Sequence, residues 1–225
     1  MKVKLQHNQA FTLVELLVVI SIIAVLASVA IPAFTGAQLN AQMTAAGNQA
    51  HGLHLGLMNY AGDNDGSFPS TENTANEAYK KLIPDYIANE KPFYVPGSAW
   101  HDGAKNKKPD DDVGTRPDYA QALERGENHW AYINGLNNTS NANLPIIADG
   151  FTDTVGQYAE VQNKKGGRWK GTKAIIVYVD GGVKQEALDK KTLKIMKTRG
   201  GQQVELFSNA FDEELQESNI KNPEG

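Results

Sequence analysis

Cysteine is absent from this chain of 225 residues. Its absence excludes a disulfide scaffold, cysteine-ligated zinc and iron–sulfur sites, and thiol catalysis. An excess of positive charge is also lacking, because 22 Lys and Arg residues face 26 Asp and Glu residues and give a net charge of −4. A broad basic surface for nucleic acid is therefore not expected, and we expect no nucleic-acid partner.

Basic residues are missing from a long stretch near the N-terminus, since no Lys or Arg occurs between Lys4 and Lys80. Within this stretch, residues 11–34 include 19 apolar residues in 24 positions. A helix of this length measures about 36 Å, which is enough to cross the hydrocarbon core of a bilayer. Because Lys2 and Lys4 precede it, the positive-inside rule places residues 1–10 in the cytoplasm and the rest of the chain outside it.

A single acidic residue, Glu15, lies inside the apolar run. A charged group in a membrane helix costs about 2.5–3.5 kcal/mol at the helix centre and less near an end, and such groups usually pair with an opposite charge. The nearest basic side chain, Lys4, is eleven positions away. An amino terminus created by cleavage before Phe11 is the alternative cationic partner.

The sequence AFTLVE at residues 10–15, followed by the apolar run, resembles the N-terminal signal of type IV pilins and type II secretion pseudopilins. The resemblance implies that a membrane-embedded prepilin peptidase cleaves between Ala10 and Phe11 and methylates the new amino group of Phe11. It gives Glu15 the role of the family's assembly glutamate and Pro32 that of its helix-disrupting proline. The family usually has Gly where this chain has Ala10.

The role of Glu15 follows from the cost of burying an unpaired charge at low dielectric. In a filament, Glu15 of one subunit would neutralise the charged amine on Phe11 of a neighbouring subunit. Pro32 lacks an N–H donor and clashes with the preceding turn, so we expect a kinked or loosened helix there.

The resemblance also implies an α+β fold with the lollipop shape of pilins. In that fold a long membrane-spanning helix packs its C-terminal half on a small antiparallel β-sheet. The chain then divides into a leader peptide at 1–10 that is removed, a transmembrane and filament-core helix at 11–34, an amphipathic continuation at 35–62, and an extracytoplasmic globular domain at 63–225 with variable loops and an acidic C-terminal tail.

A helical stripe supports the amphipathic continuation, because its apolar residues recur at alternating steps of four and three. Its members are Leu39, Met43, Ala46, Ala50, Leu53, Leu57 and Tyr60. Gly47, Gly52 and Gly56 each weaken a helix by about 1 kcal/mol relative to Ala, so we expect local bending or melting. The turn-forming residues from Gly62 to Gly66 predict the end of the helix.

A pair of histidines and a pair of aspartates in or near this helix are candidate metal ligands. His51 and His54 lie one turn apart, and we expect both to be polar and partly solvated rather than metal ligands. Asp63 and Asp65 resemble the start of a calcium loop, but Phe68 stands where an EF-hand requires Gly. A helix-terminating turn is the favoured interpretation.

A second acidic group, Asp110, Asp111 and Asp112, lies in a charged loop, and we expect it to be solvated. Calcium remains the alternative at these three residues and at Asp63 and Asp65, and no other cofactor is expected.

The segment from Tyr60 to Pro69, YAGDNDGSFP, resembles a phrase that follows the long helix in many pilin-like proteins. The run ending in Asp180-Gly181 resembles a C-terminal strand of the same group, although Lys170 and Gly182 stand where that group commonly has histidines. The resemblance fades after about Leu188.

Short β-branched runs and turn residues predict the elements of the globular domain. Expected strands are Trp130–Ile133, Leu144–Ala148, Ala174–Val179 and Lys91–Pro96; expected helices are Ala78–Ile87, Tyr119–Arg125 and Ala210–Ser218; Leu193–Met196 and Val204–Phe207 form an expected hairpin, and Asn219–Gly225 an expected frayed tail. Two strands end in Asp-Gly, at Asp149 and Asp180, and tight turns are favoured there over a pair of catalytic carboxylates.

We interpret the chain as a structural subunit and not as an enzyme. The resemblance implies a pseudopilin of a type II secretion-type filament that helps to export proteins across the outer membrane. It implies as partners a prepilin peptidase, other pilin-like subunits, an inner-membrane platform protein with its assembly ATPase, and membrane lipid before assembly. The implied location is the bacterial inner membrane with the C-terminal domain in the periplasm, and then a periplasmic or surface filament.

Other functions are retained as alternatives. One is a type IV pilus subunit for adhesion, motility or DNA uptake, and another is a membrane-anchored periplasmic binding domain that does not polymerise. A secretory signal peptide cut after Ala30 is disfavoured, because its apolar region usually has about 7–15 residues. An exported hydrolase would need a reactive constellation, whereas G-x-S-x-G does not occur and the five histidines have no evident partners.

Overall fold

The computed structural model describes residues 12–101, 108–110, 112–116 and 119–224. The chain forms two compact units, Met1–Ala41 and Gln42–Gly225. One long helix, α1 (Leu13–Asp63), contributes residues to both units. The second unit holds all of the β-structure in the described residues.

In the first unit, α1 presents an apolar surface that the chain itself does not cover. None of the side chains between Leu13 and Ala41 is buried, and Leu16 and Phe34 are 55% and 72% exposed. An 18-residue window of α1 has a mean hydropathy of 2.8, so this helix is long and apolar enough to cross a membrane. The sequence-based prediction of a long N-terminal apolar helix is confirmed.

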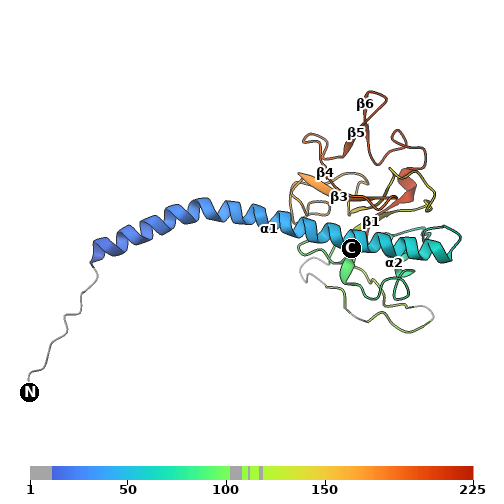
Figure 1. Cartoon of the computed structure of the whole chain (residues 1–225), viewed down its shortest axis with the longest axis horizontal. Coiled ribbons are helices and arrows are strands. Elements are labelled where there is room, and N and C mark those ends of the chain that lie inside the picture. The colour runs from blue at the N-terminus through green and yellow to red at the C-terminus, as the bar shows by residue number, and fades with distance from the viewer. Residues whose placement is uncertain (1–11, 102–107, 111, 117–118, 225) are drawn as a thin grey trace, which may run out of the picture. The chain divides into compact units, whose positions relative to one another are not determined.

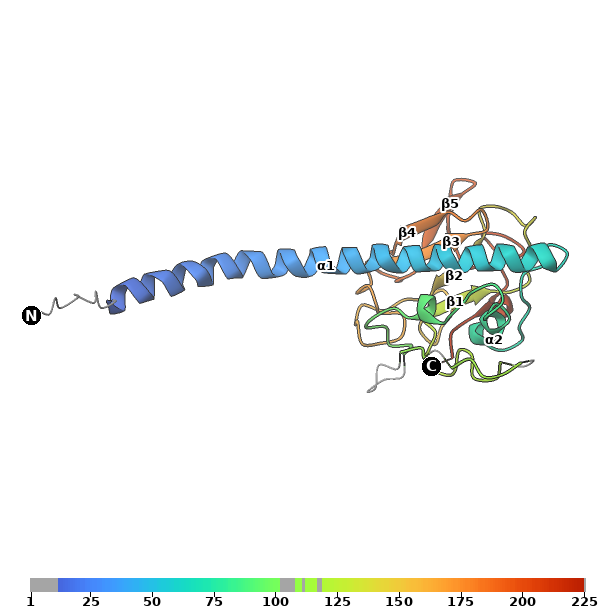
Figure 2. The same ribbon diagram turned by 60° about the horizontal axis from the view of Figure 1, so that its bottom comes forward.

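In the second unit, α1 has the buried stripe that its periodicity predicts. Met43, Ala46, Ala50, Leu53 and Leu57 are at most 3% exposed. Leu39 in the first unit and Tyr60 are only half-buried. Figures 1 and 2 both show this part of α1 running alongside the sheet, and α1 ends at Asp63, where the turn residues predicted its end.

The glycines of this half do not melt α1, which remains helical throughout. Gly56 instead allows a close approach, since a Cβ there would lie 2.6 Å from Ile87 Cγ1. Gly47 lies against Val183, and Gly52 faces open space. The expectation of local melting is therefore wrong, and at two of the three positions a neighbouring side chain packs where a larger residue would have its Cβ.

A five-stranded antiparallel sheet forms the centre of the second unit, in the order β4-β3-β2-β1-β7. Its strands are β1 (Trp130–Ile133), β2 (Pro145–Asp149), β3 (Lys173–Tyr178), β4 (Val183–Ala187) and β7 (Ile220–Lys221). Every residue of β1 and β2 is buried, as expected for strands covered on both faces. The prediction of a small antiparallel sheet, and of the first three strands within one or two residues, is confirmed.

Short elements surround the sheet. They are α2 (Ala75–Lys80), two 3₁₀ turns, η1 (Lys91–Phe93) and η3 (Glu217–Asn219), and a hairpin of β5 (Met196–Arg199) and β6 (Gln202–Glu205). Thr74 caps α2 by accepting a hydrogen bond from the N–H of Glu77 at 3.4 Å. Tyr79 of α2 donates to the carbonyl of Ala131 at 3.1 Å and so ties α2 to β1.

The hairpin β5–β6 lies within three residues of its predicted position. Its two-residue turn is Gly200-Gly201, and both residues have positive φ, 59° and 81°. A two-residue hairpin turn of this kind requires positive φ, which glycine adopts without strain. The two turn glycines therefore set the pairing register of β5 and β6. The apolar residues from which the strands were predicted do not set it.

Four predicted elements of the domain are wrong. Lys91–Pro96 is no strand, because its first three residues, with Pro92 in the first turn, form the 3₁₀ turn η1. Tyr119–Arg125 is a series of turns, with positive φ at Tyr119 and Leu123. Ala210–Ser218 contains turns and the start of η3 in place of a helix, and only the first three residues of Ala78–Ile87 are helical.

The C-terminal segment is docked and not frayed. Ile220 and Lys221 pair with Ile133 and Tyr132 of β1 as strand β7. Asn222 accepts hydrogen bonds from the backbone N–H groups of Ala75 and Phe151 at 2.9 Å and 3.0 Å. The segment looked like a polar tail in the sequence because its stabilising contacts are made by backbone and amide groups.

Candidate functional site

The predicted processing site, Ala10 and Phe11, lies outside the described residues. The first described residues form a reciprocal capping arrangement. The Thr12 N–H and hydroxyl donate to Glu15 Oε2 at 2.9 Å and 2.7 Å, and the Glu15 N–H donates to Thr12 Oγ1 at 3.3 Å. Glu15 is exposed, so its carboxylate caps the start of α1 and stays open to a further cationic partner.

Pro32 lies within α1, which continues through it. Nearby hydroxyl groups donate to carbonyl groups of the same helix, Ser28 to Val25 at 2.7 Å and Thr35 to Ile31 at 2.9 Å. Such bonds are common where a helix carries a proline in an apolar environment. The helix therefore tolerates Pro32, and no break in helical structure accompanies it.

Among the described residues, the calcium candidates do not come together as one group. Asp63 accepts a hydrogen bond from the Tyr86 hydroxyl at 3.2 Å, and Asp65 is an exposed turn residue with a φ of 50°. Asp112 accepts from the N–H of Gly114 at 3.0 Å, while Asp111 lies outside the described residues. Asp63 and Asp65 thus occupy the helix-terminating turn that the sequence favoured.

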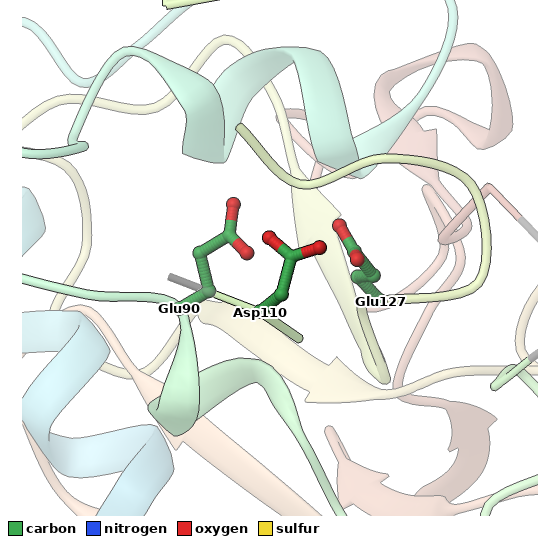
Figure 3. Close-up of side chains that lie close together, drawn as sticks. All are labelled: Glu90, Asp110 and Glu127. Atoms are coloured by element: carbon green, nitrogen blue, oxygen red, sulfur yellow. The ribbon is translucent and has the colours of Figure 1, made fainter. Parts of the chain in front are cut away.

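Asp110 is brought together with two carboxylates that sequence reasoning missed, Glu90 and Glu127 (Figure 3). Oxygen atoms of the three groups lie within 4.8 Å of one another. Glu90 and Glu127 are 0% and 1% exposed, whereas Asp110 is exposed. No motif links these residues, since 20 and 17 positions separate them along the chain, and only the fold brings them together.

Backbone N–H groups donate hydrogen bonds to all three carboxylates. Glu90 accepts from the N–H of Leu123, Glu127 accepts from the N–H of Glu124 at 2.7 Å, and Asp110 accepts from the N–H of Asp112 at 2.9 Å. Oxygen atoms of this kind are the ligands that calcium takes in proteins. The same contacts also serve to fix the surrounding loops, so the arrangement combines a structural role with the capacity to balance a cation.

The two histidines of α1 differ in environment. His54 is 4% exposed and its Nε2 lies 3.0 Å from the carbonyl of Val179, which makes Nε2 the protonated nitrogen. His51 is exposed, and the two rings stack with centroids 6.4 Å apart. Burial lowers the pKa of His54. The expectation that both histidines are partly solvated is therefore wrong for His54.

A buried polar network surrounds Asp149, the last residue of β2. His129 Nδ1 lies 2.6 Å from Ser98 Oγ, and His129 Nε2 lies 2.7 Å from Asp149 Oδ1. Asp149 Oδ2 accepts from Trp169 Nε1 at 2.8 Å. The expectation that the histidines lack partners is wrong, and Asp149 is a buried acceptor and not only a turn residue.

The order serine, histidine, aspartate is that of a nucleophile, a base and an orienting carboxylate. However, Ser98, His129 and Asp149 are 5%, 1% and 2% exposed, and Ser98 Oγ also accepts from the N–H of Trp100 at 3.2 Å. A substrate therefore cannot easily reach the Ser98 hydroxyl, and one lone pair of that hydroxyl is already used. The network joins the loop at Ser98 to β1 and β2, which indicates a structural role.

His101 continues this polar region. Its Nε2 accepts from the N–H of Val95 at 3.0 Å, so Nδ1, 3.0 Å from the carbonyl of Gly126, carries the proton. Burial lowers the pKa of His101 to about 4, and the neighbouring His129 acts in the same direction. The ring therefore stays neutral near pH 7 and acts as a fixed donor and acceptor.

The family model for the prokaryotic N-terminal methylation motif matches residues 5–31. This match includes Ala10, Phe11 and Glu15, so the chain carries a type IV pilin-like signal. The motif implies processing by a prepilin peptidase and pilin-like assembly, and it agrees with membrane anchoring through the apolar part of α1. Comparisons with curated proteins and with solved structures find no match.

Proposed function

We propose that this chain is a pseudopilin, a structural subunit of a type II secretion-type filament. The observation that carries the proposal is the methylation motif at residues 5–31, which includes the start of a helix with no buried side chain between Leu13 and Ala41. Motif and helix occur in the order that processing, membrane storage and polymerisation require. The α+β domain that follows forms the body of the subunit.

In this proposal, the prepilin peptidase removes residues 1–10 and methylates Phe11. The processed subunit waits in the inner membrane with its N-terminus in the cytoplasm and its domain in the periplasm. A platform protein and an assembly ATPase then move it into a filament with other pilin-like subunits. Glu15 supports this step, because its exposed carboxylate can accept the charged amine of a neighbour's Phe11.

The mature N-terminus tests the first step. The full chain is expressed in membranes with an active prepilin peptidase, and the intact mass of the purified product is measured. We expect a chain that starts at Phe11 and carries one added methyl group. A chain that starts at Ile31, or one that retains Met1, would overturn the filament proposal and leave an exported or merely anchored domain.

A matched variant checks the unusual residue before the cut. Ala10→Gly restores the small residue that the family usually has, and we expect the processed fraction to stay equal or rise. Ala10→Leu, which introduces a bulky side chain at the same position, is expected to leave the precursor uncut. Equal processing of both variants would show that another sequence directs the cleavage.

Secretion and pilus functions are separated by deleting the gene in the native organism. Loss of exported proteins from the culture medium, measured by mass spectrometry, is expected for a pseudopilin. Loss of sheared surface filaments with an unchanged set of exported proteins would overturn the secretion assignment in favour of a type IV pilus subunit. The absence of cysteine supports the first outcome, because many type IV pilins carry a disulfide-bounded loop that this chain cannot form.

A further inference from the structure

A cationic cavity lies between the sheet and the β5–β6 hairpin. Its volume is about 350 Å³, and its lining includes Lys184 of β4 and Lys197 and Arg199 of β5. Figures 1 and 2 show the hairpin next to β4 at the margin of the domain. Three positive side chains at one cavity stand out in a chain whose net charge is −4.

Each of these cations contacts a neighbouring side chain of the domain. Lys184 Nζ lies 4.7 Å from the centroid of the Tyr178 ring, and Arg199 Cζ lies 5.3 Å from that of Phe211. Lys197 Nζ lies 2.6 Å from Glu186 Oε1. A flexible cation that is already positioned loses less side-chain entropy when a ligand binds, so the wall of this cavity is prepared for an anion.

The charge balance limits the ligand to a small negative charge. Glu186 pairs with Lys197, and Asp212 lies 3.6 Å from Arg199. Three positive and two negative charges leave a local net charge of +1. Lys184 makes no ion pair within 4.0 Å in the part of the chain that the structure describes, and it is the cation with its charge most available.

The rest of the lining offers neutral hydrogen-bonding groups. Asn141 and Asn143 contribute amides and Thr198 contributes a hydroxyl group. Asn141 Oδ1 already accepts from the N–H of Asn143 at 3.1 Å, and Thr198 Oγ1 accepts from Gln203 Nε2 at 2.7 Å. The Asn143 amide makes no side-chain hydrogen bond to the described residues, and the Thr198 hydroxyl can still donate. These groups both donate and accept hydrogen bonds, as the hydroxyl groups of a sugar require. The volume lies at the lower end of the range of about 300–1,000 Å³ that is usual for small-ligand sites, which suits one sugar ring better than a long chain.

We propose that this cavity binds an acidic sugar residue, with the carboxylate at Lys184 and Arg199 and the ring hydroxyl groups at Asn141, Asn143 and Thr198. A nucleic acid fits less well, because it needs a cationic track that neutralises many phosphates, and here the net charge is +1 at one cavity. An acidic peptide would use the cations but offers few hydroxyl groups to the Asn143 amide and to the hydroxyl proton of Thr198. This assignment does not depend on assembly of the filament.

The test is a binding titration of the full chain in detergent micelles by isothermal calorimetry. The probes are tri-galacturonate, a neutral trisaccharide of glucose, and tri-glutamate. We expect tri-galacturonate to bind with a Kd of about 1 mM or tighter, and at least about tenfold more tightly than either of the other probes, because it alone satisfies both the charge and the hydroxyl groups.

Variants locate the site. Lys184→Ala is expected to weaken tri-galacturonate binding about tenfold, and Asn143→Ala about threefold. Lys190→Ala is the matched control, since Lys190 is an exposed lysine on the same stretch of chain outside the cavity. Unchanged thermal unfolding of each variant would show that the domain is intact.

Three results would overturn the proposal. The first is no heat of binding with tri-galacturonate at 10 mM, a concentration about ten times the weakest Kd expected here. The second is equal binding of tri-glutamate, which would assign the cavity to an acidic peptide. The third is an equal effect of Lys190→Ala and Lys184→Ala, which would indicate diffuse attraction to the surface and no defined site.

Discussion

The two halves of α1 present apolar side chains in opposite situations. Up to Ala41, no side chain of the helix is buried, whereas Leu53 and Leu57 in the second half are fully buried. No charged residue separates Glu15 from Asp63, so charge does not distinguish the halves. What differs is the partner: the domain covers the second half, and a surface outside the chain must cover the first.

The comparison also explains the difference in pattern between the halves. The second half needs one apolar stripe, because only one face contacts the domain. The first half is apolar on all faces, as a helix in lipid or in the core of a filament requires. Substitutions in the first half should therefore affect assembly, and substitutions in the second half should affect the stability of the domain.

The largest expected effect is the loss of assembly when Glu15 is changed. Glu15→Gln keeps the size of the side chain and removes the charge that would pair with the amine of a neighbour's Phe11. We expect filament material to fall at least tenfold, measured by sedimentation of sheared or membrane-extracted polymer. Normal polymer from Glu15→Gln would support a simple anchor and contradict the filament proposal.

Stability of the domain provides the control for that variant. All three tryptophans lie in the second unit and are at most 4% exposed, so tryptophan fluorescence during urea unfolding reports on the domain alone. Because Glu15 belongs to the first unit, its substitution should leave this unfolding curve unchanged.

A leucine pair tests the two halves directly. Leu57→Ala should reduce the free energy of unfolding of the domain by about 2–5 kcal/mol, because it leaves a cavity at a fully buried position. Leu17 is 56% exposed, and Leu17→Ala should leave domain unfolding unchanged. Both are measured by urea unfolding of the full chain in detergent micelles. A large loss with Leu17→Ala would show that the domain depends on the first half.

Leu55 provides an exposed control for Leu57 within the same turn of α1. It lies two residues before Leu57 and is 52% exposed, so Leu55→Ala should change the unfolding free energy by less than about 0.5 kcal/mol. Equal effects of Leu55→Ala and Leu57→Ala would mean that helix propensity, and not burial, controls the stability of this half.

Alanine substitutions at two glycines should change the unfolding free energy by smaller amounts, and with opposite signs. Gly56→Ala places a methyl group 2.6 Å from Ile87 Cγ1, and overpacking of this kind should cost about 1–3 kcal/mol. Gly52 faces open space, so Gly52→Ala should stabilise the domain by about 0.5–1 kcal/mol through helix propensity. Urea unfolding measures both, and equal signs would contradict the packing role of Gly56.

The sequence predicted the parts of this molecule that local periodicity encodes. The long helix, its buried stripe, its end near Asp63 and the strand β1 all follow from residue spacing and turn chemistry. The methylation motif could be recognised for the same reason, since its residues are adjacent in the chain. Local patterns thus predicted these elements and the N-terminal signal, and the family resemblance that the signal carries implied the fold class.

Contacts between distant residues could not be predicted in this way. Glu90 and Glu127 approach Asp110 only after three loops have folded, and the pair His129–Asp149 forms because β1 and β2 are neighbours. The strand β7 is stabilised by pairing with β1, which its polar sequence does not indicate. Tertiary contacts override weak local preferences in such segments.

The smallest expected effect is a pH dependence that arises in the buried half of α1. Because the folded-state pKa of His54 lies below its unfolded value of about 6.5, the unfolded chain takes up a proton first as the pH falls. Stability contributed by neutral His54 is therefore present above about pH 6.5 and is lost below it. His51 opposes a charge on His54 and Asp180 favours one, so both modify the size of this effect.

The matched pair is His54→Gln and His51→Gln, compared by urea unfolding at pH 7.5 and 5.5. His54→Gln should remove about 1 kcal/mol or less of the pH-dependent loss of stability, whereas His51→Gln should retain most of it, since His51 is exposed. His101, whose pKa lies at about 4, contributes to the same trend and remains in both variants. An equal pH response in the two variants would show that burial of His54 against the domain does not control its protonation.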